Sequence, residues 1–359
     1  IVIILKEKNF INFLGQDKFL EFKNNMRKKI LVTGSEGFIG SHLVEKLIEQ
    51  KYNVVCLCLY NSFNSWGWLD DLRSKKHNNC QFAMGDVRDF NLIDSIISEC
   101  DYIFHLASLI SIPYSYQAVN SYYDVNLKGT LNILESAKKH KIKKIIHTST
   151  SEIYGSAQFI PITEEHPVNA QSPYAASKIA ADQLAISYFK SFNTPVTIAR
   201  PFNTYGPRQS LRAIIPSILV QLINKEKNLL IGSGFPLRDF CYIEDTIRGF
   251  IDIMHGKSTE GETFNIGSGF SISISELCKI CMEILKYEIP IKYENKRKRP
   301  INSEVDHLKC SYRKINKKLG WKPKYSGKNG LIKGIKRFTN WLENSKNHNQ
   351  YRGYEEYIY

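Results

Sequence analysis

Short apolar runs alternate with amphipathic stretches through the first part of the chain. Runs such as Ile30–Thr33 and Lys144–Thr148 have the length and apolar content of buried parallel strands. Stretches such as Ser41–Gln50 and Asp124–His140 repeat apolar residues at the spacing of one helix face. The same patterns predict further strands at 53–60, 102–106 and 196–200, and further helices at 92–100 and 174–192. This order is typical of an α/β fold with a doubly wound parallel sheet.

Beyond Arg200 the alternation loosens, because prolines divide the chain into short pieces. Residues 263–266 predict one more strand that returns to the main sheet, and the remainder predicts a smaller second lobe. We therefore expect an N-terminal extension of no assigned role at 1–25, a dinucleotide-binding domain at 26–200 with a return segment at 239–268, a substrate-binding lobe at 201–238 and 269–345, and a tail at 346–359.

The chain has 359 residues and a net charge of +14, from 49 basic and 35 acidic residues. Much of the basic excess lies between Lys292 and Lys324, but no nucleic-acid-binding motif accompanies it. We interpret the run as a solvated basic face in which one or two arginines meet a diphosphate, and expect no nucleic-acid partner.

Eight cysteines form no disulfide-like framework. Cys278 and Cys281 form a CxxC, but no second pair completes a zinc site, so we expect no metal. Free thiols are typical of a reducing compartment, which predicts a cytoplasmic protein. No segment is long enough to cross a membrane.

Three glycines follow the first strand and open a helix at the spacing GxxGxxG: Gly34, Gly37 and Gly40. Such a loop lets a pyrophosphate approach the backbone, and the helix N-terminus attracts the anion. The acid that often ends the second strand and holds the adenosine ribose is missing from 59–64, so the choice between NAD and NADP stays open. Asp86 is a candidate for the adenine, or a helix-capping or turn residue.

Tyr174 and Lys178 lie four residues apart, so they share one face of the predicted helix. A neighbouring ammonium favours the phenolate, and we expect it to lower the pKa of the tyrosine enough for it to act as a base. The segment 148–155 adds a carboxylate, Glu152, just after a strand. These groups suit an enzyme that oxidises a sugar carbon and then acts on the ketone.

The GxxGxxG loop, the HLAS of 105–108, the NxxGT of 126–130, YxxxK and the RPFN of 200–203 together resemble the extended short-chain dehydrogenase/reductase family of nucleotide-sugar epimerases and dehydratases. The resemblance covers the chain from Met26 to about Trp341. It implies a Rossmann-type sheet, a smaller C-terminal lobe that binds a nucleotide-diphosphate sugar, tightly bound NAD or NADP, and a homodimer. The cofactor-binding residues it implies are Gly34, Gly37, Phe38, Ile39, Gly40, Asp86, Val87, Leu106, Ala107, Ser108, Tyr174 and Lys178.

The same resemblance implies a catalytic set of Thr150, Tyr174 and Lys178. Thr150-Ser151-Glu152 is similar to the segment that 4,6-dehydratases carry after this strand. Once C4 of the hexose is a ketone, a carboxylate can remove the acidified C5 proton, and water then leaves from C6. Glu152 would be this base. Ser151 stands where the dTDP-glucose branch has Asp, so Glu152 would itself protonate the leaving hydroxyl.

A narrower likeness concerns the two-tryptophan segment 60–70 and the segment 111–116, which resemble dehydratases of legionaminic-acid-type pathways. Those enzymes act on nucleotide-linked N-acetylglucosamine. The tryptophans could equally serve packing between the lobes. By resemblance, the substrate-binding residues are Ser111, Asn203, Arg208, Arg238 and Arg299.

Three other functions remain open from the sequence. A UDP-glucuronate decarboxylase resembles the chain at Thr150–Glu152, and a 4-epimerase shares the remaining motifs. A non-catalytic nicotinamide-binding regulator is disfavoured by the presence of both Tyr174 and Lys178.

Overall fold

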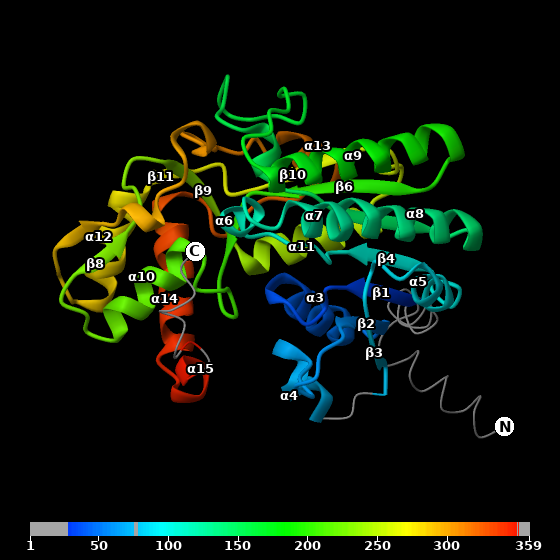
Figure 1. Cartoon of the computed structure of the whole chain (residues 1–359), viewed down its shortest axis with the longest axis horizontal. Helices are drawn as coiled ribbons and strands as arrows, with labels where there is room; N and C mark the ends of the chain where they lie inside the picture. The colour runs from blue at the N-terminus through cyan, green and yellow to red at the C-terminus, as the bar shows by residue number, and fades with distance from the viewer. Residues whose placement is uncertain (1–27, 75–77, 350, 352–359) are drawn as a thin grey trace, which may run out of the picture.

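The structure is a computed structural model that describes residues 28–74, 78–349 and 351 (Figure 1). The extension expected at 1–25 lies outside the described residues, as do positions 350 and 352–359 of the expected tail. A seven-stranded sheet lies at the centre, in the order β3-β2-β1-β4-β5-β6-β10, and every neighbouring pair is parallel. Its strands are β1 (Lys29–Thr33), β2 (Asn53–Leu59), β3 (Cys80–Gly85), β4 (Tyr102–His105), β5 (Lys144–Thr148), β6 (Val196–Pro201) and β10 (Thr263–Ile266).

Both faces of this sheet are covered by helices, as the near-continuous apolar strands require. Ile30 and Val32 of β1 pack on the side of α3 (Phe38–Glu49) and α11 (Ile243–His255). Leu31 faces the opposite side, where α5 (Phe90–Ile97), α8 (Gly129–His140) and α9 (Pro173–Phe192) pack. The alternation along β1 therefore places successive side chains in two separate cores. The predicted doubly wound α/β fold is confirmed, and β10 is the expected returning strand.

The second lobe is built from short strands and helices that share a core with the α3–α11 side of the sheet. One small sheet has the order β11-β9-β7, and β8 pairs with β12 in another. The strands are β7 (Asn203–Tyr205), β8 (Leu229–Ile231), β9 (Leu237–Tyr242), β11 (Ser271–Ser273) and β12 (Ile291–Tyr293). The helices are α10 (Ile214–Ile223), α12 (Ile274–Leu285), α13 (Arg313–Leu319), α14 (Gly327–Leu342) and α15 (Ser345–Asn349). Figure 1 shows α10, α12 and α14 beside the central sheet, and α12 contacts both α10 and α14.

Short helical pieces occupy several connections. They are η1 (Gly67–Leu69), α4 (Asp70–Ser74), α6 (Ile112–Ser115), α7 (Val119–Tyr122), η3 (Ser151–Tyr154), η4 (Asn295–Arg297) and η5 (Ile301–Ser303). None of the described helices is both long and apolar enough to span a bilayer.

The helix predicted over 124–140 is interrupted, because residues Tyr123–Lys128 form a π-helical turn (η2) before α8 begins. Asn126 lies in this turn and is buried. Its amide group bonds the backbone N–H and C=O of Leu109, at 2.9 and 3.1 Å, and the hydroxyls of Ser108 and Ser177. These contacts tie the turn to the segment after β4 and to α9. The apolar spacing along the segment did not reveal them.

Candidate functional site

The glycine loop and the segment after β4 lie against each other at the carboxyl ends of their strands. Gly34 has a φ of +64°, and a side chain there would come within 2.9 Å of the Ala107 nitrogen. The Thr33 hydroxyl accepts the N–H groups of Leu106 and Ala107 at 3.1 and 3.0 Å. This cradle, which a Cβ at position 34 would fill, fits close passage of a dinucleotide.

The N-terminus of α3 completes this edge. The helix starts at Phe38 after Gly37, so Phe38, Ile39 and Gly40 form its first turn. A side chain at Gly40 would lie 2.1 Å from the carbonyl oxygen of Gly34, so the turn packs directly on the loop. Unpaired N–H groups of such a first turn are the usual partners of a pyrophosphate.

Asp86 and Val87 follow β3 nearby. Asp86 accepts the backbone N–H of Arg88 at 2.9 Å and pairs with its guanidinium at 2.6 Å, and hydrogen bonding from Arg88 lowers the pKa of Asp86. Asp86 is therefore a turn residue in this structure, and the residue that caps α5 is Asp89. Val87 is buried, and its carbonyl accepts from Asn132 at 2.9 Å. Contact of either residue with the adenine stays a prediction.

The face of α9 that begins at Tyr174 is buried. Ser172 caps the helix, Pro173 occupies its first turn, and Tyr174 and Lys178 are 6% and 4% exposed. The Lys178 ammonium donates to the Thr148 carbonyl oxygen of β5 at 2.7 Å. The Tyr174 ring packs edge-on against the Tyr122 ring, whose hydroxyl donates to the Ser111 carbonyl. Tyr122 therefore contacts both Ser111 and Tyr174.

The expectation that Lys178 would lower the pKa of Tyr174 is wrong. Burial raises the pKa of this phenol, and the hydrogen bond with Thr150 opposes that effect only in part. Burial also lowers the pKa of Lys178 to about 8. Removing both groups from water disfavours their charged forms.

A buried carboxylate opposes the loss of charge on Lys178. Asp182 lies one further turn along α9, is 1% exposed, and raises the pKa of Lys178. Its Oδ2 accepts from the Ser149 hydroxyl at 2.8 Å and from Arg200 Nη2 at 3.1 Å, and His147 Nε2 lies 3.2 Å from Oδ1. Burial lowers the pKa of His147, which favours the neutral ring. The spacing of four residues that joins Tyr174 to Lys178 continues to Asp182, and this signal was available in the sequence.

Glu152 belongs to the same site. Thr150 caps the short helix η3, its hydroxyl accepting the Glu152 N–H at 3.2 Å, and Ser151 is buried. The Glu152 side chain is 11% exposed and its Oε2 lies 3.4 Å from Arg299 Nη1. Its charge acts on the Tyr174 phenol and raises the pKa of that phenol. The structure therefore brings Thr150, Ser151, Glu152, Tyr174 and Lys178 together.

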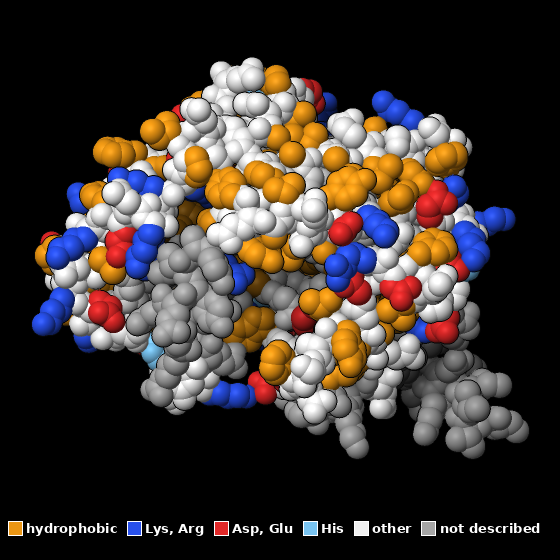
Figure 2. Space-filling model, in the orientation of Figure 1, with side chains coloured by type: hydrophobic (Ala, Val, Ile, Leu, Met, Phe, Trp, Pro, Cys, Tyr) orange, Lys and Arg blue, Asp and Glu red, His pale blue; other side chains and the backbone are white. Residues whose placement is uncertain are grey.

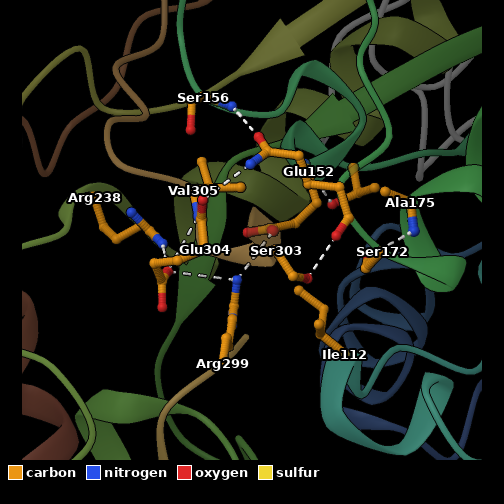
Figure 3. A network of polar contacts seen from close by, with 12 residues as sticks. Ile112, Glu152, Ser156, Ser172, Ala175, Arg238, Arg299, Ser303, Glu304 and Val305 are labelled. Carbon is orange, nitrogen blue, oxygen red and sulfur yellow. Dashed lines mark hydrogen bonds and ion pairs between the residues drawn. The ribbon is translucent and has the colours of Figure 1, made fainter. Parts of the chain in front are cut away.

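Two arginines of the second lobe meet at another carboxylate, that of Glu304 (Figure 3). Arg238 donates to Glu304 at 2.7 Å, and Arg299 lies 3.8 Å from the same carboxylate oxygen. An open groove borders the cluster, and its lining residues are Tyr116, Ser156, Asn169, Ala170, Gln171, Pro300, Asn302 and Ser303. Glu304 was not recognised in the sequence, where it is a single acid just after the densest basic run.

The remaining predicted substrate residues are placed differently. Asn203, on β7, donates to the Asp239 carbonyl at 3.5 Å. Arg208 pairs with Glu45 of α3 at 2.7 Å rather than with the carboxylates that hold Arg238 and Arg299. Its Nη1 is buried without a hydrogen-bond partner, and its backbone has a φ of +72°. Contact of both residues with a diphosphate stays a prediction.

Within the described residues, no three His, Cys, Asp or Glu side chains are grouped as metal ligands. Cys278 and Cys281 are buried free thiols on α12.

Comparison with known proteins assigns the family. The family model of GDP-mannose 4,6-dehydratase matches residues 31–333. The chain belongs to this family of NAD-dependent epimerases and dehydratases. It is 31% identical over 331 residues to human dTDP-D-glucose 4,6-dehydratase, covering 89% of this chain and 92% of the human one.

Two solved structures share its fold. DesIV, a dTDP-glucose 4,6-dehydratase from Streptomyces venezuelae solved with NAD bound, has a TM-score of 0.80 at 28% identity, covering 90% of this chain and 99% of that one. UDP-glucose 4-epimerase from Thermotoga maritima, solved with UDP-glucose, has a TM-score of 0.77 at 29% identity, covering 88% and 98%. NAD or NADP is therefore the cofactor, which the glycine cradle fits. The narrower likeness to legionaminic-acid-type dehydratases stays a prediction.

Asp182→Asn is predicted to shift the pH dependence of turnover. Lys178 is protonated below its pKa, so activity that requires the ammonium should fall as pH rises through about 8. Removing the Asp182 charge lowers the pKa of Lys178, so this limb should move down by about one pH unit. Steady-state kcat–pH profiles measure the shift, and the position of a limb does not depend on the fraction of folded enzyme.

Asp182→Glu retains the charge, so its kcat–pH profile should fall at the same pH as that of the unaltered protein. Ser149→Ala removes one hydrogen bond to Asp182 but no charge, and should move the limb much less. A limb that stays in place in Asp182→Asn would contradict this account.

Proposed function

We propose that the protein is a nucleotide-sugar 4,6-dehydratase that converts an NDP-hexose, with NDP-N-acetylglucosamine as the expected substrate, to the 4-keto-6-deoxy sugar. The observation that supports this most is the place of Glu152. Its carboxylate is largely buried, close enough to act on the Tyr174 phenol, and paired with Arg299. A 4-epimerase needs the tyrosine but no second base at this position.

The chain's own residues divide the proton transfers between them. Tyr174 takes the C4 hydroxyl proton, and its hydrogen bond with Thr150 stabilises the phenolate. When held at the loop of Gly34, Gly37 and Gly40, NAD or NADP would supply the hydride acceptor for C4 and the hydride donor for C6. Glu152 removes the C5 proton, whose bond electrons form the C5–C6 double bond as the C6 oxygen leaves. Because Ser151 is a poor acid, Glu152 passes the same proton to the departing hydroxyl. When C6 has received hydride, C5 takes up a proton that comes from solvent and Tyr174 releases its proton to solvent, so the net change is the loss of one water.

Arg238 and Arg299 support binding of the diphosphate. Guanidinium groups match phosphate oxygens in pairs. Arg299 pairs with Glu152, and Arg238 pairs with Glu304, which Arg299 also approaches. A 4-epimerase is the second candidate, because the Thermotoga maritima epimerase has nearly the same fold similarity as the dehydratase. A cytoplasmic location stays a prediction from the free thiols.

The test is mass spectrometry of the products formed from UDP-, GDP- and dTDP-linked hexoses, including UDP-N-acetylglucosamine. A dehydratase gives a product lighter by one water. An isomer of unchanged mass would identify a 4-epimerase, and release of carbon dioxide from UDP-glucuronate would identify a decarboxylase.

Glu152→Gln is predicted to abolish water loss while leaving oxidation at C4 intact. The amide cannot take the C5 proton, whereas Tyr174 and Lys178 are untouched. Reduced cofactor should therefore accumulate in the variant on mixing with substrate, seen by its absorbance, with product formation lowered about a hundredfold or more. Glu165→Gln, at an exposed carboxylate of the 163–166 loop, is the matched control. Full turnover in Glu152→Gln would remove Glu152 from the mechanism.

Arg299→Ala is predicted to weaken the binding of nucleoside diphosphates about tenfold or more, because a charge-assisted pair of hydrogen bonds is lost. Isothermal titration with UDP, GDP and dTDP measures this effect without chemistry. Arg297→Ala is the control, since Arg297 lies two residues before Arg299 and pairs with Glu294 instead of Glu152. An equal loss in both variants would show a nonspecific effect of charge and contradict the assignment.

We further propose a homodimer formed through α8 and α9. Apolar side chains are exposed on α8 and α9 and on the preceding α6, α7 and η2, and Figure 2 shows hydrophobic surface over the α6–α8 helices. The exposed side chains are Tyr114, Val119, Tyr123, Leu131 and Phe192. Leu131→Glu should convert the dimer to a monomer in analytical ultracentrifugation, whereas Phe235→Glu, at an exposed site of the second lobe, should not. A monomeric unaltered protein would exclude this proposal.

A further inference from the structure

The end of β2 lacks the acid that usually holds the adenosine ribose of a dinucleotide. The strand finishes at Leu59, and Tyr60 and Asn61 follow. Neither side chain can offer the negative charge that normally separates NAD from NADP at this position. The group that distinguishes NAD from NADP must therefore come from another segment that reaches the end of β2.

Glu36 reaches this place from the glycine loop. It lies between Gly34 and Gly37, and its carboxylate oxygen Oε1 accepts the backbone N–H of Leu59 at 2.9 Å. The carboxylate is therefore held at the carboxyl end of β2 although it belongs to another segment. The backbone of Glu36 is fixed as well, because its carbonyl accepts the Trp68 N–H at 3.1 Å. A side chain at Gly67 would lie only 2.9 Å from that carbonyl oxygen, so the loop packs closely on Glu36.

The second oxygen of this carboxylate is unused. Glu36 Oε2 is buried and has no hydrogen-bond partner. A buried carboxylate oxygen without a donor is unfavourable, and native proteins seldom leave one unless a ligand supplies the donor. Burial accordingly raises the pKa of Glu36, against the hydrogen bond from Leu59. The ionisable neighbours of Glu36 include the thiols of Cys56 and Cys58, and Asp70 acts on Cys58 in turn. None of these three groups carries a positive charge that could pair with the carboxylate.

We propose that Glu36 binds the adenosine ribose hydroxyls and makes the protein select NAD over NADP. An ionised carboxylate accepts hydrogen bonds from ribose hydroxyls but offers no donor. It also repels the 2′-phosphate of NADP, and a like charge at close range is a strong means of discrimination. The proposal rests on the cofactor of the family and holds whether the reaction is dehydration or epimerisation.

The test compares the unaltered protein with Glu36→Gln. Glutamine keeps an oxygen for the Leu59 N–H but removes the charge. Glu49→Gln is the control, since Glu49 is an exposed acid at the end of α3 that pairs with Lys46. Two readouts are needed besides activity: the dinucleotide released from the purified protein on heat denaturation, identified by liquid chromatography and mass spectrometry, and the Kd values of NAD and NADP for the stripped protein.

The unaltered protein and Glu49→Gln should release NAD and prefer it to NADP about a hundredfold or more, and Glu36→Gln should lower that preference about tenfold or more. The preference is the ratio of the two Kd values measured on the same protein. Partial unfolding of a variant affects both values equally and leaves their ratio unchanged. Release of NADP from the unaltered protein, or an unchanged preference in Glu36→Gln, would overturn the proposal. Failure of the dehydration proposal would leave both readouts unaffected.

Discussion

A lysine ammonium buried next to a buried phenol is the constraint on which the rest of the site depends. Burial acts against the charged form of both Tyr174 and Lys178. Asp182 provides the opposing charge. Ser149 and Arg200 donate to one of its oxygens, and His147 Nε2 lies 3.2 Å from the other. The groups come from α9, β6 and the end of β5, so the chemistry depends on how the parallel sheet meets this helix. Removing one of the charged partners would leave an uncompensated charge in the interior.

The second lobe is joined to this site through hydrogen bonds rather than through apolar packing alone. Gln171, just before α9, donates to the carbonyls of Asn302 and Glu304 at 3.2 and 3.0 Å. The Ser303 hydroxyl donates back to the Gln171 carbonyl at 2.5 Å. This segment carries Arg299 and Glu304, so the hydrogen bonds hold Arg299 of one lobe beside Glu152 of the other. A substrate that spans both lobes would thus meet the proposed diphosphate-binding arginines and the proposed reacting groups in one fixed arrangement.

Much of this organisation could be predicted from the sequence, because the relevant signals are local. The strand at 144–148 has the predicted bounds, and the YxxxK spacing placed Tyr174 and Lys178 on one helix face. The interruption at η2 could not be predicted, since Asn126 is held by residues distant in sequence. The pKa of Tyr174 was misjudged because spacing reveals a neighbouring charge but not the extent of burial. Glu304 and Glu36 were missed because their partners, Arg238 and the Leu59 N–H, become neighbours only in the fold.

The central claim is that Tyr174 and Glu152 act on adjacent carbons of one hexose ring. The most direct measurement follows deuterium from C4 of the substrate, with NMR of the product formed in ordinary water. The account predicts deuterium at C6 of a 4-keto-6-deoxy sugar and, in heavy water with unlabelled substrate, solvent deuterium at C5. Deuterium that returns to C4 with no solvent label at C5 would contradict the account, since Tyr174 would then act at C4 while Glu152 removed no proton from C5.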